Sequence, residues 1–106
     1  MSKKTRLEYD YFEEKLTAGT LVDEICFYFS ADETEAEHCF GYMNGYDRPY
    51  WVGLCDVQGG CDFETAADLL NAPIYDGQSL KNRWRQVIIC SIAGCSPRNW
   101  MKYQGN

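Results

Sequence analysis

Three runs of β-branched and aromatic residues, separated by short turn-forming segments, limit most strongly what this chain can fold into. The runs cover residues 25–29, 38–43 and 50–55, and residues 44–49 between the last two are rich in turn formers. Strands with short connections usually pair with their sequence neighbours, so the pattern predicts an antiparallel meander. A further run, residues 87–92, is continuously apolar, which is typical of a buried central strand.

Helical signals lie on both sides of these runs. Apolar side chains at helical spacing and residues suited to N-caps and stops mark several short helices. The predicted segments are a helix over 6–15 that ends before Gly19, a helix over 65–70 capped by Thr65 and stopped by Pro73, a helix over 79–87 capped by Ser79, and a last helical turn over 96–101 opened by Pro97.

Length and composition bound the architecture. A chain of 106 residues, 45% of them apolar, fits one domain over residues 1–106 with a modest core. The order of elements predicts an α+β domain, with a small antiparallel sheet of about four strands and two or three short helices on one face. The apolar runs fall well short of the roughly 20 residues that cross a bilayer. No signal-peptide core is recognised, and we expect a cytoplasmic protein without membrane contact.

Charge is distributed very unevenly along the chain. Residues 7–76 contain all sixteen carboxylates and two bases, Lys15 and Arg48, a formal charge of −14 within a total of −6. Residues 77–106 contain five bases and no acid. Such a pattern concerns partners and steering rather than the fold. A strongly acidic segment would repel a phosphate backbone, so we expect no direct nucleic-acid binding by residues 81–85.

Carboxylates interleaved with aromatic residues predict a protein-binding surface. Dispersed carboxylates imitate the charge of a nucleic-acid backbone, so a basic surface of a nucleic-acid-binding protein would accept them. In composition the chain is similar to small acidic inhibitors and immunity proteins of phages and mobile elements, and a nuclease or a CRISPR effector is the partner that best suits the charge. The expected partner-binding residues are Asp23, Glu24, Asp32, Glu33, Glu35, Glu37, Tyr42, Tyr46 and Asp47.

Two other interpretations stay open. The chain is an accessory subunit if it docks through aromatic residues such as Trp84 and Trp100, since large aromatic side chains often anchor interfaces. It is a domain without a special acidic surface if Arg83 and Arg85 pair with carboxylates of the strands, because charge runs are usually solvated faces.

The six cysteines do not indicate a disulfide scaffold. Without a secretory signal we expect free thiols. Five residues separate Cys55 from Cys61 and four separate Cys90 from Cys95, whereas paired zinc ligands usually have two to four between them. The sequence therefore predicts no metal and no cofactor.

No catalytic set is recognised either. His38 and Cys39 are neighbours on a predicted strand, so their side chains should point to opposite faces and not form a base and nucleophile pair. We find no nucleophile, base and orienting group in a familiar pattern, and we assign no catalytic residue. A small zinc or thiol enzyme is the remaining alternative.

Overall fold

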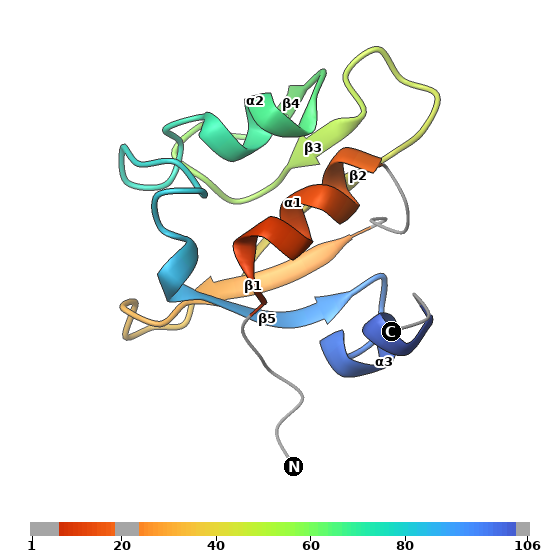
Figure 1. Ribbon diagram of the computed structural model, residues 1–106. Helices are drawn as coiled ribbons and strands as arrows, with labels where there is room; N and C mark the ends of the chain where they lie inside the picture. The colour runs from red at the N-terminus through yellow and green to blue at the C-terminus, as the bar shows by residue number, and fades with distance from the viewer. Residues whose placement is uncertain (1–6, 19–23, 104–106) are drawn as a thin grey trace.

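The structure is a computed structural model that describes residues 7–18 and 24–103. In chain order its elements are α1 (Tyr9–Ala18), β1 (Ile25–Phe29), β2 (His38–Tyr42), β3 (Tyr50–Val52), β4 (Cys61–Phe63), α2 (Ala66–Asn71), the 3₁₀ helix η1 (Trp84–Gln86), β5 (Val87–Ile92) and α3 (Pro97–Tyr103). Figure 1 shows their arrangement.

The strands form one antiparallel sheet in the order β4-β3-β2-β1-β5. The predicted α+β fold and the meander of β1, β2 and β3 are confirmed. Strand β4 is additional to the four strands predicted from the sequence. It was not predicted because three residues are too few to show an alternating pattern. Its position depends on Gly60, whose φ of +83° turns the chain back against β3.

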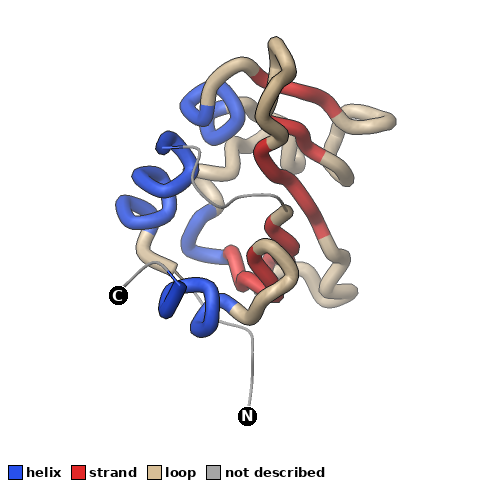
Figure 2. The backbone as a smooth tube through the Cα atoms, turned by 90° about the vertical axis from the view of Figure 1, so that its right-hand side faces the viewer, coloured by secondary structure: helices blue, strands red, loops and turns tan. Residues whose placement is uncertain are grey.

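The helices lie on one side of the sheet, as predicted, and Figure 2 shows this layering from the edge. Side chains of β1 and β2 that point to this side, such as Phe27 and Phe40, are fully buried against Phe12 of α1 and Leu69 of α2. Alternate strand residues point the other way. We call that side the open face and define it by Cys26, Tyr28, Cys39, Trp51 and Asp62.

The prediction that residues 87–92 form a central strand is wrong. β5 pairs with β1 and lies at the edge of the described sheet. In the pairing of β1 with β5, Cys26 lies opposite Ser91, but the next residue of β1, Phe27, lies opposite Ile89. Cys90 of β5 therefore has no partner residue on β1 and forms a β-bulge. The bulge lets Ile89 and Ile92 both face the core, which explains an apolar run without alternation.

The predicted helix over residues 79–87 is also wrong. Ser79 does accept a hydrogen bond from the Asn82 amide at 3.0 Å, but turns follow and only η1 is helical. The amide of Gln86 donates to the carbonyl of Arg83, a bond of the tighter 3₁₀ type. Because β5 begins at Val87, the backbone must become extended before an α-helix could continue.

The other helices match the sequence closely. The Asp68 amide donates to Thr65 Oγ1 at 3.1 Å, so Thr65 caps α2 as predicted. Pro97 opens α3, and α1 begins three residues later than expected. Gly19, the predicted stop of α1, lies outside the described residues. None of the described helices is long and apolar enough to span a bilayer.

Candidate functional site

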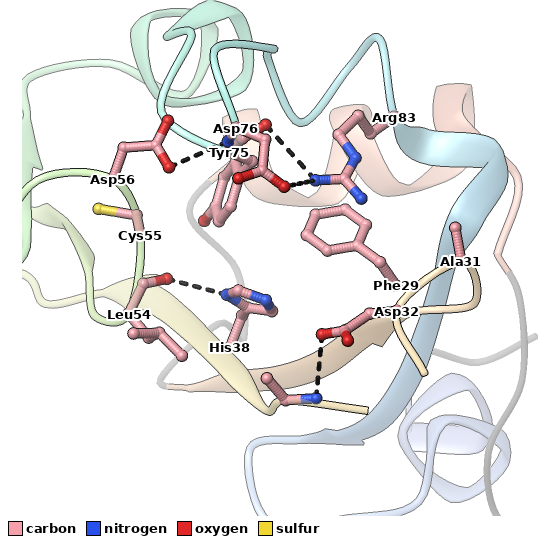
Figure 3. A pocket seen from close by; sticks show the side chains of 11 residues that line it. Phe29, Ala31, Asp32, His38, Leu54, Cys55, Asp56, Tyr75, Asp76 and Arg83 are labelled. Carbon is pink, nitrogen blue, oxygen red and sulfur yellow. Dashed lines mark hydrogen bonds and ion pairs between the residues drawn. The ribbon is translucent and has the colours of Figure 1, made fainter. Parts of the chain in front are cut away.

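A cavity of about 380 Å³ opens at the end of the sheet where β1 ends and β2 begins. Figure 3 shows its walls, which come from the β1–β2 connection, the loop after β3, the turn at residues 75–78 and the segment before η1. The lining residues are Phe29, Ala31, Asp32, Ala36, His38, Leu54, Cys55, Asp56, Tyr75, Asp76 and Arg83.

Asp56 fixes the turn at residues 75–78 on one side of the cavity. Its carboxylate accepts hydrogen bonds from the amides of Asp76 at 3.0 Å and Gly77 at 2.9 Å. Both turn residues have positive φ, 57° and 76°, as a type I′ turn requires. Both hydrogen bonds lower the pKa of Asp56, and the one from the Gly77 amide has the larger effect. This carboxylate therefore stays ionised.

Asp32 is held in the same way within the β1–β2 connection. Its carboxylate accepts from the side-chain hydroxyl of Thr34 at 2.8 Å, from the Thr34 amide at 2.9 Å and from the Ala36 amide at 3.3 Å. The hydroxyl bond is the largest cause of the lowered pKa of Asp32. A second ionised carboxylate therefore has a fixed place at the cavity.

Arg83 brings the positive charge of the cavity wall. Its guanidinium carbon lies 3.6 Å from the ring centre of Phe29, and it donates to the Tyr75 carbonyl at 3.4 Å and to Gln86 Oε1 at 3.0 Å. It also pairs with the exposed carboxylate of Asp76 at 3.6 Å. One C-terminal base, Arg83, thus pairs with a carboxylate, but Asp76 lies on a turn and not on a strand, where one interpretation expected such pairs.

His38 and Tyr75 complete the lining of the cavity. His38 Nδ1 lies 3.0 Å from the Leu54 carbonyl and must be the donor, which leaves Nε2 of the neutral ring as an acceptor. The Tyr75 hydroxyl is buried and has no hydrogen-bond partner among the described residues. Burial raises its pKa, so it keeps its proton. With three carboxylates and one guanidinium, the cavity is rich in acceptors.

The structure divides the predicted partner-binding residues between the two ends of the sheet. We call residues 30–37 the acidic loop, which carries the predicted Asp32, Glu33, Glu35 and Glu37 beside the cavity. Glu24, Tyr42, Tyr46 and Asp47 lie at the other end of β1 and β2, about 17 Å away for strands of five residues. Asp23 lies outside the described residues.

Two cavity carboxylates were missed by sequence reasoning. Asp56 and Asp76 join the acidic loop through the loop after β3 and through the turn at residues 75–78. The signal that could have found them is the dipeptide Asp76-Gly77, which is typical of a turn but does not show what that turn lies against. Only the fold places these two residues beside Asp32.

The aromatic residues that were weighed as anchors differ in exposure. Tyr46 is 65% exposed in the β2–β3 connection, whereas Tyr42 is half-buried with its ring centre 4.9 Å from that of Tyr50. Trp84 and Trp100 are 9% and 2% exposed. An accessory subunit that docks through aromatic side chains would therefore have to use residues other than these two tryptophans.

The neighbours His38 and Cys39 point to opposite faces, as predicted. His38 stacks on Phe27 on the core side, with ring centres 5.3 Å apart, while the Cys39 sulfur contacts Cys26 on the open face. Cys55 also lines the cavity, but its thiol is directed to the Val57 carbonyl and points away from His38 in Figure 3. The described geometry thus brings no thiol to His38 as a nucleophile and base pair.

The cysteines weighed as zinc ligands do not come together as one set in the described part of the chain, although Cys55 and Cys61 contact each other. The four cysteines in question are Cys55, Cys61, Cys90 and Cys95, and none belongs to a group of three or more potential ligands there. The group that does occur is Glu24, Cys26 and Cys39, whose ligand atoms lie within 4.8 Å of one another. Sequence spacing could not reveal it, because its cysteines lie on different strands.

Comparisons of the chain with protein-family models, with curated proteins and with solved structures give no match. The cavity, the acidic loop and the open face are therefore interpreted from their own chemistry.

Proposed function

We propose that this protein is an acidic protein-binding module, an inhibitor or immunity-type protein that blocks the basic, nucleic-acid-binding surface of a partner such as a nuclease or a CRISPR effector. One observation supports this most: Asp32, Asp56 and Asp76 surround one cavity, next to the exposed Glu33 and Glu35 of the acidic loop. The module binds through this end of the sheet.

The chemistry of the cavity suits the side chains of a basic partner. Carboxylates and the second ring nitrogen of a neutral His38 accept hydrogen bonds, and lysine and arginine side chains donate them. Backbone amides already hold Asp32 and Asp56 in place, so binding requires little further ordering of these groups. The charges around the cavity also steer a basic surface toward it.

Binding to purified nucleases, including CRISPR effectors, tests the proposal. Raising the ionic strength from about 0.01 M to about 0.15 M shortens the screening length from roughly 30 Å to roughly 8 Å, so affinity should fall steeply. The double variant Glu33→Lys, Glu35→Lys should weaken binding about tenfold or more, because it places like charges against the basic partner.

A control of equal charge separates the surface from the net charge. The double variant Glu14→Lys, Asp62→Lys changes the formal charge by the same amount at exposed positions on α1 and β4, which carry none of the expected partner-binding residues. It should weaken binding far less. Equal losses of affinity in the two variants would show that only the overall charge of the protein matters. An affinity that does not change with ionic strength would contradict the proposed function.

A further inference from the structure

On the open face, Cys26 and Cys39 lie directly opposite each other on neighbouring strands. Their sulfur atoms are 3.0 Å apart. The Cys39 carbonyl accepts a hydrogen bond from Gly53, on the β3 side of β2, so the backbone groups of Cys39 point away from β1. Cys26 and Cys39 are therefore a non-hydrogen-bonded pair, the kind in which opposed side chains come closest.

This geometry lies close to that of a disulfide. The Cα atoms of a non-hydrogen-bonded pair stand about 4.5 Å apart, within the range of about 4.4 to 6.8 Å found across disulfides. Forming the bond requires the sulfurs to approach from 3.0 Å to about 2.05 Å. A small adjustment of the two side chains provides that movement without a change in strand pairing.

A metal fits the same sulfurs less well, although Glu24 offers a third ligand. Structural zinc sites almost always have four ligands, whereas the described residues here offer three. The sulfur separation does not decide between the two states: thiolates bound to zinc at about 2.3 Å stand roughly 3.8 Å apart, so the sulfurs would move from 3.0 Å by a similar amount in either case. Burial, the contact with Cys26 and the charges of Glu24 and Glu37 raise the pKa of Cys39 to about 12. Metal binding would need this thiol to be deprotonated beside those carboxylates.

We propose that Cys26 and Cys39 are a site of reversible thiol oxidation, where a disulfide oxidant such as oxidised glutathione closes a cross-strand disulfide. The bond would link β1 and β2, the two strands that flank the acidic loop. The acidic loop supplies Asp32 and Ala36 to the cavity wall, and β2 supplies His38. This inference does not depend on the proposed function.

The reaction proceeds by two thiol–disulfide exchanges. One cysteine thiolate attacks a sulfur of oxidised glutathione, which forms a mixed disulfide and releases one glutathione thiolate. The second cysteine thiolate then attacks the protein sulfur of that mixed disulfide, forms the Cys26–Cys39 bond and releases the second glutathione. Two protein thiols are oxidised, one glutathione disulfide is reduced, and the two thiol protons pass to the two glutathiones. Each cysteine acts once as the nucleophile, so the raised pKa of Cys39 makes the reaction slow at neutral pH.

The full chain is incubated with oxidised glutathione, its remaining thiols are blocked with N-ethylmaleimide, and its peptides are mapped by mass spectrometry. We expect a linked peptide pair that contains Cys26 and Cys39, no N-ethylmaleimide on either of these two cysteines, and reversal of the link by dithiothreitol. Cys26→Ser and Cys39→Ser should each lose this link and retain a glutathione adduct on the remaining cysteine.

The double variant Cys55→Ser, Cys61→Ser is the matched control and should retain the Cys26–Cys39 link. Alkylation of both Cys26 and Cys39 after the oxidant has reacted with other cysteines would overturn the proposal. Stoichiometric zinc that survives dialysis in the wild type, and is lost in both single variants, would overturn it in favour of a metal site. If the variants fold poorly, the peptide map of the wild-type protein still shows whether Cys26 and Cys39 become linked.

Discussion

Gly60 shows how much a single residue contributes to the sheet. Its φ is +83°, and a Cβ atom built there would lie 2.2 Å from the Val52 carbonyl oxygen. Gly59 has nearly the same φ, +84°, but a Cβ there meets nothing within 4 Å. Two adjacent glycines are typical of a break in a strand, yet a single sequence does not show that only the second glycine lies against β3.

We expect Gly60→Ala to destabilise the protein much more than Gly59→Ala. The positive φ costs about 1 to 2 kcal/mol at either position, while the clash at Gly60 adds a similar strain because backbone atoms must move. Urea unfolding followed by circular dichroism measures both variants. Equal losses would mean that the close approach of Gly60 to Val52 does not exist in solution.

Among the elements, α2 shows the most direct link from sequence to structure. Thr65 has an extended backbone, and its hydroxyl accepts the Asp68 amide, as its position ahead of an apolar segment predicted. Because this cap satisfies an amide that has no partner within the helix, Thr65→Ala should lower the free energy of unfolding by about 1 kcal/mol. Thr65→Ser keeps the hydroxyl and should lose much less in the same denaturation experiment. A large loss with serine would assign the effect to the methyl group.

The turn at residues 75–78 makes a pH-dependent contribution. Hydrogen bonds from Gly77 and Asp76 lower the pKa of Asp56 below its usual 3.8. A carboxyl group with a lowered pKa stabilises the folded state above its unfolded pKa, and this stabilisation is lost as the pH falls through the folded pKa. Asp56→Asn should therefore be less stable than the wild type at about pH 6, and the difference should shrink below about pH 4.

Unfolding in urea at several pH values measures this effect. Asp47→Asn removes the same charge from the exposed β2–β3 connection and is the control. A gap between wild type and Asp56→Asn that stays constant down to acidic pH would contradict a stabilising role of the ionised carboxylate.

At the scale of the whole molecule, Trp84 joins distant parts of the chain. Its indole Nε1 donates a hydrogen bond to the Leu7 carbonyl at 2.7 Å, across 77 positions in the sequence. The centre of its ring lies 4.7 Å from the ring centre of Phe12. The sequence left Trp84 open as a residue that docks onto another protein. An amphipathic pattern does not show whether the apolar side of a helix packs within the same chain or against another protein. Here the partner is α1 of the same chain.

We expect Trp84→Phe to lower the free energy of unfolding by about 1 to 3 kcal/mol, because it leaves the buried Leu7 carbonyl without its donor. Trp51→Phe is the matched control, since the Trp51 indole nitrogen has no hydrogen-bond partner among the described residues. Circular dichroism during urea unfolding measures both. A loss at Trp51 as large as at Trp84 would mean that ring packing, rather than the hydrogen bond, is responsible.

The sequence by itself determined the class of fold. Runs of β-branched residues predicted the meander of β1, β2 and β3, and capping chemistry predicted α2 and the start of α3, because these signals act between residues close in the chain. The sequence also placed His38 and Cys39 on opposite faces, since strand geometry alternates with every residue.

Only the tertiary structure decided how distant segments meet. The edge position of β5, the bulge at Cys90, the approach of Asp56 to the turn at residues 75–78 and the opposition of Cys26 to Cys39 all depend on strand order and register. Register is set by how buried side chains pack across strands, and a single sequence does not contain that pairing explicitly. The cavity and the thiol pair therefore emerged from the fold, although every residue in them was visible in the sequence.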